Sequence, residues 1–164
     1  LGERCPVSST TTRATLFNIN MVHTREHLMR AVYEGIGYNL RWILENYKQD
    51  YGFTCDNFRI IGGGALDDGW MQIIADITGK HFAVVKDPRN AGAVGVAVVA
   101  LIGLGELSGF EAAKDFVQIE KRYKPNPENK AIYDDLFMDY KNIYKSLEKA
   151  YIIANGRRFT GEEQ

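Results

Sequence analysis

The stretch that decides the fold is FRIIGGGALDDGWMQIIADITGKHFAVVK, residues 58–86. A short apolar run, Phe58–Ile61, stops at three consecutive glycines, and a second run covers His81–Lys86. Apolar runs of this length, bounded by glycine or proline, are typical of buried β-strands. The sequence therefore predicts two strands, the first of which ends in a glycine turn.

A helix is predicted between these two strands. Asp67 or Asp68 can cap its start, and Gly79 marks its end. The apolar residues between these points follow helical spacing; they are Trp70, Met71, Ile74 and Ile77. Strands that alternate with helices imply parallel pairing and an α/β layer architecture.

Helices are also predicted on either side of this segment. Apolar residues recur every three or four positions from Thr24 to about Tyr47, and Gln49–Asn57 then reads as a polar loop. The run Ala91–Leu104 has about 14 residues, too few for a membrane span of about 18, so we expect a buried helix. Phe116–Tyr123 is expected to be extended. The last helix carries a stripe formed by Ile132, Leu136, Tyr140, Ile143, Leu147 and Tyr151.

Length and composition limit the function classes. The 164 residues suit one compact domain, expected over residues 1–154, with a polar tail at 155–164. Twenty basic and 21 acidic residues give a net charge of -1, which does not favour nucleic acid or an anionic membrane as partner. Cys5 and Cys55 lack metal-ligand spacing, so a reducing cytoplasm is expected. Because the first residue is Leu1 rather than Met, we expect a piece of a longer protein.

The glycine turn is the first candidate site. Glycines let a backbone approach a ligand closely, and the amides and positive dipole of the following helix favour phosphate or ribose oxygens. A dinucleotide motif would need a third glycine where Asp67 stands, although Asp87 does end the next strand. The pattern therefore indicates a nucleotide site, a dehydrogenase fits it in part, and a turn that binds nothing stays open.

A second candidate is the string His23-Thr24-Arg25-Glu26-His27. Two imidazoles one helical turn apart, with a carboxylate beside them, could bind zinc and activate water. The third ligand cannot be picked from the sequence, so a polar cluster at a helix start is the favoured interpretation.

A third candidate is the aromatic stripe of the last helix. Stacked bases would require basic residues on the same face, but the lysines fall mostly beside the rings. Core packing is therefore the favoured interpretation of Tyr133, Phe137, Tyr140, Tyr144 and Tyr151.

Several motifs in one order resemble the C-terminal domain of the FGGY carbohydrate kinases, xylulose kinases above all. They are Gly2-Glu3-Arg4-Cys5-Pro6, Arg13, His23-Thr24, Arg30–Ile36, Gly62-Gly63-Gly64-Ala65, Trp70, Gln72, Ala75-Asp76, Gly79 and Ala91–Gly95. The resemblance implies transfer of the γ-phosphate of ATP, with Mg²⁺, to a hydroxyl of a ketose or polyol, xylulose being favoured. It also implies a ribonuclease H-like, actin-like domain with three layers and a mixed, mainly parallel sheet, the second half of a two-domain kinase.

The resemblance also assigns site residues. Gly62, Gly63, Gly64 and Ala65 match the adenosine motif, while Asp67 stands where the family usually has Ser. On the sugar side, Glu3 and Arg4 are the candidates, and Thr11-Thr12 and Ala14 replace the Asp-Pro and Gly that the family tends to carry around Arg13. The catalytic aspartate and the phosphate loop belong to family sequence upstream of Leu1, so this chain alone should be inactive.

Partners and alternatives follow from the same resemblance. The expected partners are ATP or ADP, a sugar or polyol, the N-terminal kinase domain and, through the last helix, a second copy. The alternative is a non-catalytic regulatory domain of the same fold that responds to a sugar or nucleotide.

Overall fold

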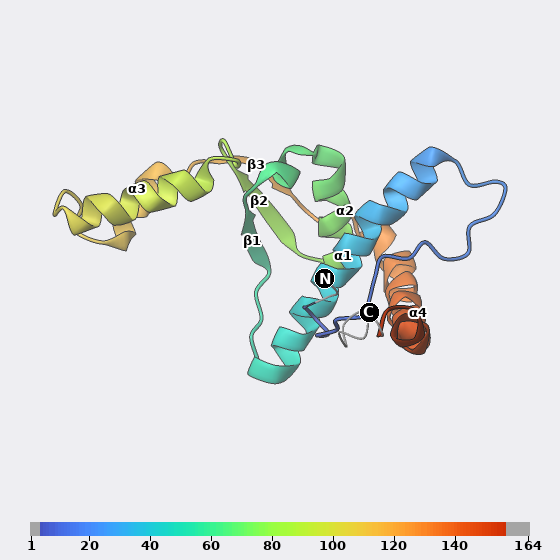
Figure 1. Cartoon of the computed structure of the whole chain (residues 1–164). Helices are drawn as coiled ribbons and strands as arrows, with labels where there is room; N and C mark the ends of the chain where they lie inside the picture. Colours follow the sequence, from blue (N-terminus) through green and yellow to red (C-terminus); the bar gives the residue numbers. More distant parts are fainter. Residues whose placement is uncertain (1–3, 157–164) are drawn as a thin grey trace. The chain divides into compact units, whose positions relative to one another are not determined.

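The computed structural model describes residues 4–156 and divides into two compact units (Figure 1). The sheet unit is Cys55–Pro127, and the helical unit is made of the described parts of Leu1–Thr54 and Glu128–Gln164. None of the helices within residues 4–156 is long and apolar enough to cross a membrane. The single domain expected over residues 1–154 stays a prediction, and most of the expected tail, 157–164, lies outside the described residues.

The sheet has three strands in the order β1-β2-β3. β1 is Asn57–Ile60, β2 is His81–Val85 and β3 is Ile119–Tyr123. β1 and β2 pair in parallel, with Asn57 opposite His81, which confirms the pairing expected from the strand-helix-strand order. β2 and β3 pair antiparallel. The sheet is therefore mixed as expected, but with one pair of each kind rather than mainly parallel.

Helix α2, Asp68–Thr78, packs against β2 and β3 and closes the core of this unit. Its buried side chains include Met71, Ile74, Ala75 and Ile77, and they face a β2 that is buried from Phe82 to Val85. The helix ends at Gly79, whose φ of +65° is the left-handed conformation that glycine adopts without strain. Both ends of α2 thus lie where the sequence predicts them.

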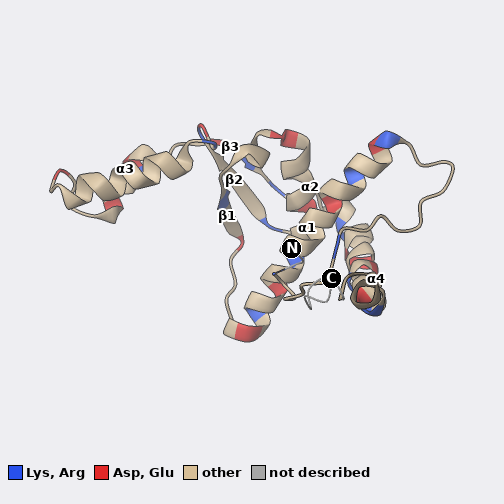
Figure 2. Cartoon of the chain, viewed as in Figure 1, with Lys and Arg blue, Asp and Glu red and all other residues tan. Residues whose placement is uncertain are grey.

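Helix α3, Ala91–Gly103, corrects one expectation. Only Val98 of this helix is buried, and Val96 is 70% exposed, so α3 is not the buried helix that its apolar sequence predicts. The reason is geometric: within the sheet unit, α3 projects from the sheet and packs against the short 3₁₀ segment η2, Phe110–Phe116 (Figure 1). Figure 2 shows α3 almost without charge along its length.

The helical unit is built from two long helices, α1 over Arg25–Tyr51 and α4 over Lys130–Asn155. α1 runs one turn past the predicted end near Tyr47 and stops at Gly52, with φ of +65°, so the polar loop is shorter than predicted. The 3₁₀ turn η3, Pro127–Asn129, immediately precedes α4.

Aromatic rings form the core between α1 and α4. Tyr38 of α1 lies with its ring centroid 6.2 Å from Tyr133, 6.3 Å from Phe137 and 5.5 Å from Tyr140. Core packing of the aromatic stripe is thereby confirmed for these rings. The apolar stripe predicted from Ile132 is wrong at its first two positions, since Ile132 is 59% and Leu136 39% exposed. The large rings of Tyr133 and Phe137, next to them in sequence, take the inner face.

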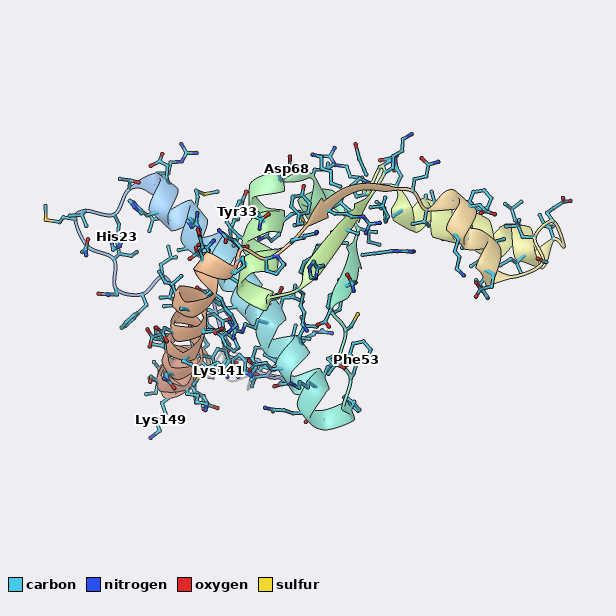
Figure 3. The ribbon with its side chains drawn as sticks, turned by 180° about the vertical axis from the view of Figure 1, so that it is seen from behind. His23, Tyr33, Phe53, Asp68, Lys141 and Lys149 are labelled. Carbon is cyan, nitrogen blue, oxygen red and sulfur yellow. The ribbon has the colours of Figure 1, made fainter. Side chains whose placement is uncertain are left out.

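Charged side chains close the edges of this aromatic core. Arg41 donates to Asp134 (2.7 Å), and Lys141 pairs with Glu45 (3.1 Å). The Arg41 guanidinium and the Lys141 ammonium each lie 4.4 Å from the centroid of the Phe137 ring. Figure 3 shows Lys141 and Lys149 along α4. The helix pair is thus held by packing, cation–π contacts and ion pairs together.

Candidate functional site

The glycine turn lies where β1 ends, and its first residue has a conformation that requires glycine. Gly62 has φ of +98°, which residues with a side chain rarely adopt. Its N–H donates to the carbonyl of Pro88 at 2.7 Å, so the turn is tied to the loop after β2. A single 3₁₀ turn, η1 over Gly63–Leu66, then leads toward α2.

Gly64 is required by crowding rather than by its dihedral angle. A Cβ built on it would lie 2.4 Å from Cζ3 of Trp70, well inside van der Waals contact. The indole ring therefore occupies the space that a side chain at position 64 would need. The fold itself explains this glycine, with no ligand invoked.

Gly63 differs from both neighbours. A Cβ at this position would meet only the Nε of Arg89, at 3.9 Å, which is an ordinary contact distance. The described structure therefore has room for a side chain here, and φ is not in the left-handed region. Of the three glycines, Gly63 is the one at which a substitution can test ligand approach without disturbing the fold.

Asp67 caps the helix that follows the turn. Its Oδ1 accepts from the backbone N–H of Trp70 at 2.9 Å, as an N-cap residue does. Ala65, two residues earlier, is buried at 3% exposure. The structure thus brings all five predicted cofactor residues into one turn, but Asp67 and Ala65 already have structural roles there.

A second loop, residues 86–90, contacts this turn, and the sequence pointed only to Asp87 within it, as the residue that ends the strand. Asp87 has φ of +50°, unusual for a non-glycine residue, and its carboxylate accepts from the Asn90 amide at 2.7 Å. Asp87 therefore shapes its own turn. The consecutive Asp-Pro-Arg-Asn is a strong turn signal and indicates that Arg89 lies in the same loop.

A cavity of about 720 Å³ lies beside α3 in the sheet unit. Its walls are mostly the small and branched apolar side chains of α3 together with Phe110 and Phe116 of η2. Arg59 and Lys86 also line the cavity and carry positive charge. None of the five predicted cofactor residues lines this cavity, although Ile61, the residue before the glycine turn, does.

The histidine string lies at the start of α1, and its ring nitrogens cap backbone amides. Nδ1 of His27 accepts from Thr24 N–H (3.1 Å), and Nδ1 of His23 accepts from Asn20 N–H (2.9 Å). The pKa of Glu26 is lowered, chiefly by a hydrogen bond with the Thr24 side chain. Figure 3 labels His23 in the loop before α1. Within residues 4–156, no three His, Cys, Asp or Glu side chains come together as a metal site.

The predicted sugar-side residues divide between the described and masked parts. Glu3 lies outside the described residues, and Arg4 is exposed. The segment that follows is fastened to the long helices: Asn39 donates to the Cys5 carbonyl (3.2 Å) and Asn155 to the Thr11 carbonyl (3.0 Å). The same segment contains Thr12, which shares a 3.5 Å hydrogen bond with the Tyr144 hydroxyl.

Comparison with known proteins places this geometry among sugar kinases. Residues 1–104 match the model of the FGGY family of carbohydrate kinases, C-terminal domain. Xylulose kinase of Bacillus subtilis (strain 168) is 34% identical over 146 residues, which is 88% of this chain and 29% of that protein. Gluconokinase of Bacillus licheniformis is 28% identical over 158 residues, 96% of this chain and 31% of that protein.

Solved structures agree with these sequence relatives. A ligand-bound xylulose kinase from Lactobacillus acidophilus superposes with a TM-score of 0.80 at 27% identity, over 92% of this chain and 30% of that one. A gluconate kinase from Lactobacillus acidophilus gives a TM-score of 0.79 at 27% identity, with the same 92% and 30% shares. The chain thus spans about a third of the length of the proteins it matches.

Proposed function

We propose, from the premise that this chain belongs to the FGGY family of carbohydrate kinases, that it holds the adenosine part of ATP at Gly62–Ala65. The match of residues 1–104 to the C-terminal domain of that family carries the proposal. The open space at Gly63 supports it, because a ligand can reach the backbone there.

The reaction proposed for the intact protein is transfer of the γ-phosphoryl group of ATP to a hydroxyl of a ketose or polyol. Xylulose is the favoured substrate, since several relatives of this chain are xylulose kinases. Phosphoryl transfer depends on positioning and on stabilising charge with metal and cationic groups. This chain would supply nucleotide positioning, and the catalytic aspartate is expected in the part of the protein upstream of Leu1.

The residues of the glycine turn suit ATP, and Mg²⁺ would depend on the phosphates of the nucleotide. Backbone at the glycine turn suits a nucleoside, whereas the described residues hold no cluster of carboxylates that could bind Mg²⁺ by themselves. Because Mg²⁺ in kinases is held largely by nucleotide phosphates, it would reach this site with ATP. The three-layer, actin-like arrangement, the N-terminal domain as partner, a cytoplasmic location and a homodimer belong to the same proposal.

Nucleotide binding by this chain is the experiment that tests the site. ADP is titrated into the chain and followed by calorimetry and by tryptophan fluorescence, because Trp70 packs on the glycine turn. Gly63→Val places a branched side chain where the ligand would lie, and Gly63→Ala gives a smaller step. We expect saturable binding that weakens in Gly63→Ala and is lost in Gly63→Val, with all three chains melting alike. Absence of binding by the parent chain would overturn the proposed site.

The kinase activity needs the intact protein. We expect ATP-dependent phosphorylation of D-xylulose or a related ketose or polyol, and no turnover by residues 1–164 alone. If the intact protein bound the sugar and nucleotide without phosphorylating any ketose or polyol, the regulatory alternative would replace the kinase.

A further inference from the structure

Arg89 lies on the loop that contacts the glycine turn. Its Nε is the atom that a Cβ on Gly63 would approach, at 3.9 Å. The neighbouring residue, Pro88, is buried and accepts the Gly62 N–H through its carbonyl. The backbone that carries Arg89 is therefore fastened to the turn, and the side chain starts beside Gly63.

The loop that carries Arg89 is also fixed from within. Asn90 N–H donates to the Asp87 carbonyl at 3.1 Å, and the Asn90 amide donates to the Asp87 carboxylate. These bonds hold Asp87 at a positive φ that it would otherwise rarely adopt. A rigid support of this kind limits where the Arg89 side chain can reach.

The Arg89 guanidinium is exposed, and its planar group has no ion-pair or hydrogen-bond partner among residues 4–156. An unpaired guanidinium beside a backbone is available to a ligand. Guanidinium is planar, delocalised and weakly hydrated, so it stacks on aromatic faces more readily than the compact ammonium of lysine does.

We infer that Arg89 forms one wall of the nucleotide site and stacks on the adenine base of a nucleotide held at Gly63. This inference rests on the proposed function, because it takes adenosine to be the ligand of the glycine turn. It adds a side chain to a site that otherwise offers backbone. The role is positioning of the base, since a guanidinium plane favours a flat aromatic ring over an aliphatic group.

Calorimetric titration of the chain with adenosine and with ADP tests the inference. Arg89→Ala should weaken the binding of both ligands by a similar factor, on the order of tenfold, because the base is common to both. Arg89→Lys keeps the charge but loses the plane, and should still weaken both. Arg122→Ala is the matched control: it removes another exposed arginine of the same unit, on β3, and should change neither.

Each other outcome has a distinct meaning. A loss for ADP with adenosine unchanged would show a phosphate contact and overturn stacking, as would full recovery of both ligands in Arg89→Lys. Equal affinities of Arg89→Ala and the parent chain would overturn the inference and leave the proposed function standing. If the parent chain bound neither ligand, the proposed nucleotide site at Gly62–Ala65 would fail, and the inference about Arg89 with it.

Discussion

The indole ring of Trp70 lies in the space that a side chain at Gly64 would fill, with Cζ3 only 2.4 Å from the position of a Cβ there. The two residues come from the 3₁₀ turn η1 and the first turn of α2, and Asp67 between them caps that helix. The first turn of α2 therefore packs against the glycine turn. Part of the motif that resembles a nucleotide loop is explained by this packing.

Substitution of Gly64 should destabilise the sheet unit through the Trp70 ring. Gly64→Ala forces the ring or the turn to shift, and overpacking of this kind costs about 1–3 kcal/mol. Urea unfolding of the parent chain, Gly64→Ala, Trp70→Ala and the double variant measures the coupling. We expect the Gly64→Ala cost to shrink when Trp70 is absent, while Gly63→Ala costs little. An equal cost in both backgrounds would contradict the contact.

Loss of the Asp67 cap should weaken α2. Asp67→Ala leaves the Trp70 N–H without its side-chain acceptor and should lower stability by about 1 kcal/mol. Asp67→Ser, which restores the residue usual in the family, is also a good cap and should cost only a few tenths of a kcal/mol. Thermal unfolding of both variants measures the two losses, and equal losses would contradict capping as their cause. If Asp67→Ser keeps most of the stability that Asp67→Ala loses, the residue at this position acts as a helix cap in this chain.

The fold was predictable where the sequence carries local signals. The strand predicted at Phe58–Ile61 is β1, one residue earlier at Asn57–Ile60, and the helix ends at Gly79 as its cap predicts. Parallel pairing of β1 and β2 followed from their order along the chain. These features depend on residues close in sequence, so periodicity and turn chemistry are sufficient to find them.

Features that depend on distant partners were missed. The sequence predicted core positions for Tyr133 and Phe137 but also for Ile132, which is exposed. The Tyr38 ring of α1 packs against Tyr133 and Phe137, and no pattern within α4 reports that choice. Exposure of α3 likewise depends on what covers it rather than on its own apolar sequence. At the glycine turn, the sequence predicted the residues but could not show that Arg89 lies against Gly63.

Acid should weaken the contact between α1 and α4 through Asp134. Hydrogen bonds from Lys130 and then Arg41 hold the pKa of this carboxyl below its ordinary value. A carboxyl whose pKa is lower in the folded state stabilises the fold fully at pH values above its unfolded pKa of about 4. This stabilisation is lost as the pH falls through the folded pKa.

Comparison of Asp134→Asn with the parent chain tests this dependence. At pH 7 the variant should be less stable by about 1 kcal/mol, and near pH 2 the two should converge. Urea unfolding at a series of pH values measures the difference. Asp135→Asn, at the neighbouring exposed position, is the control. It should be as stable as the parent chain at pH 7 and should stay so down to pH 2. A difference between parent and Asp134→Asn that persisted unchanged to pH 2 would refute the ionic contribution.

Two tyrosines of the aromatic core should respond oppositely to loss of their hydroxyl groups. The Tyr133 hydroxyl lies 2.9 Å from Arg30 and 3.1 Å from Glu34, whereas the Tyr38 hydroxyl is buried and has no protein partner within residues 4–156. Burial of an unpaired hydroxyl costs free energy. The same burial is the main reason that the pKa of Tyr38 is raised. Tyr133→Phe should therefore lose about 1 kcal/mol, while Tyr38→Phe should be as stable as the parent chain or more stable. Urea unfolding of the two variants side by side measures both effects. A loss in Tyr38→Phe as large as that in Tyr133→Phe would show that the Tyr38 hydroxyl is bonded in solution, through an internal water, and that the core between α1 and α4 is hydrated at that point.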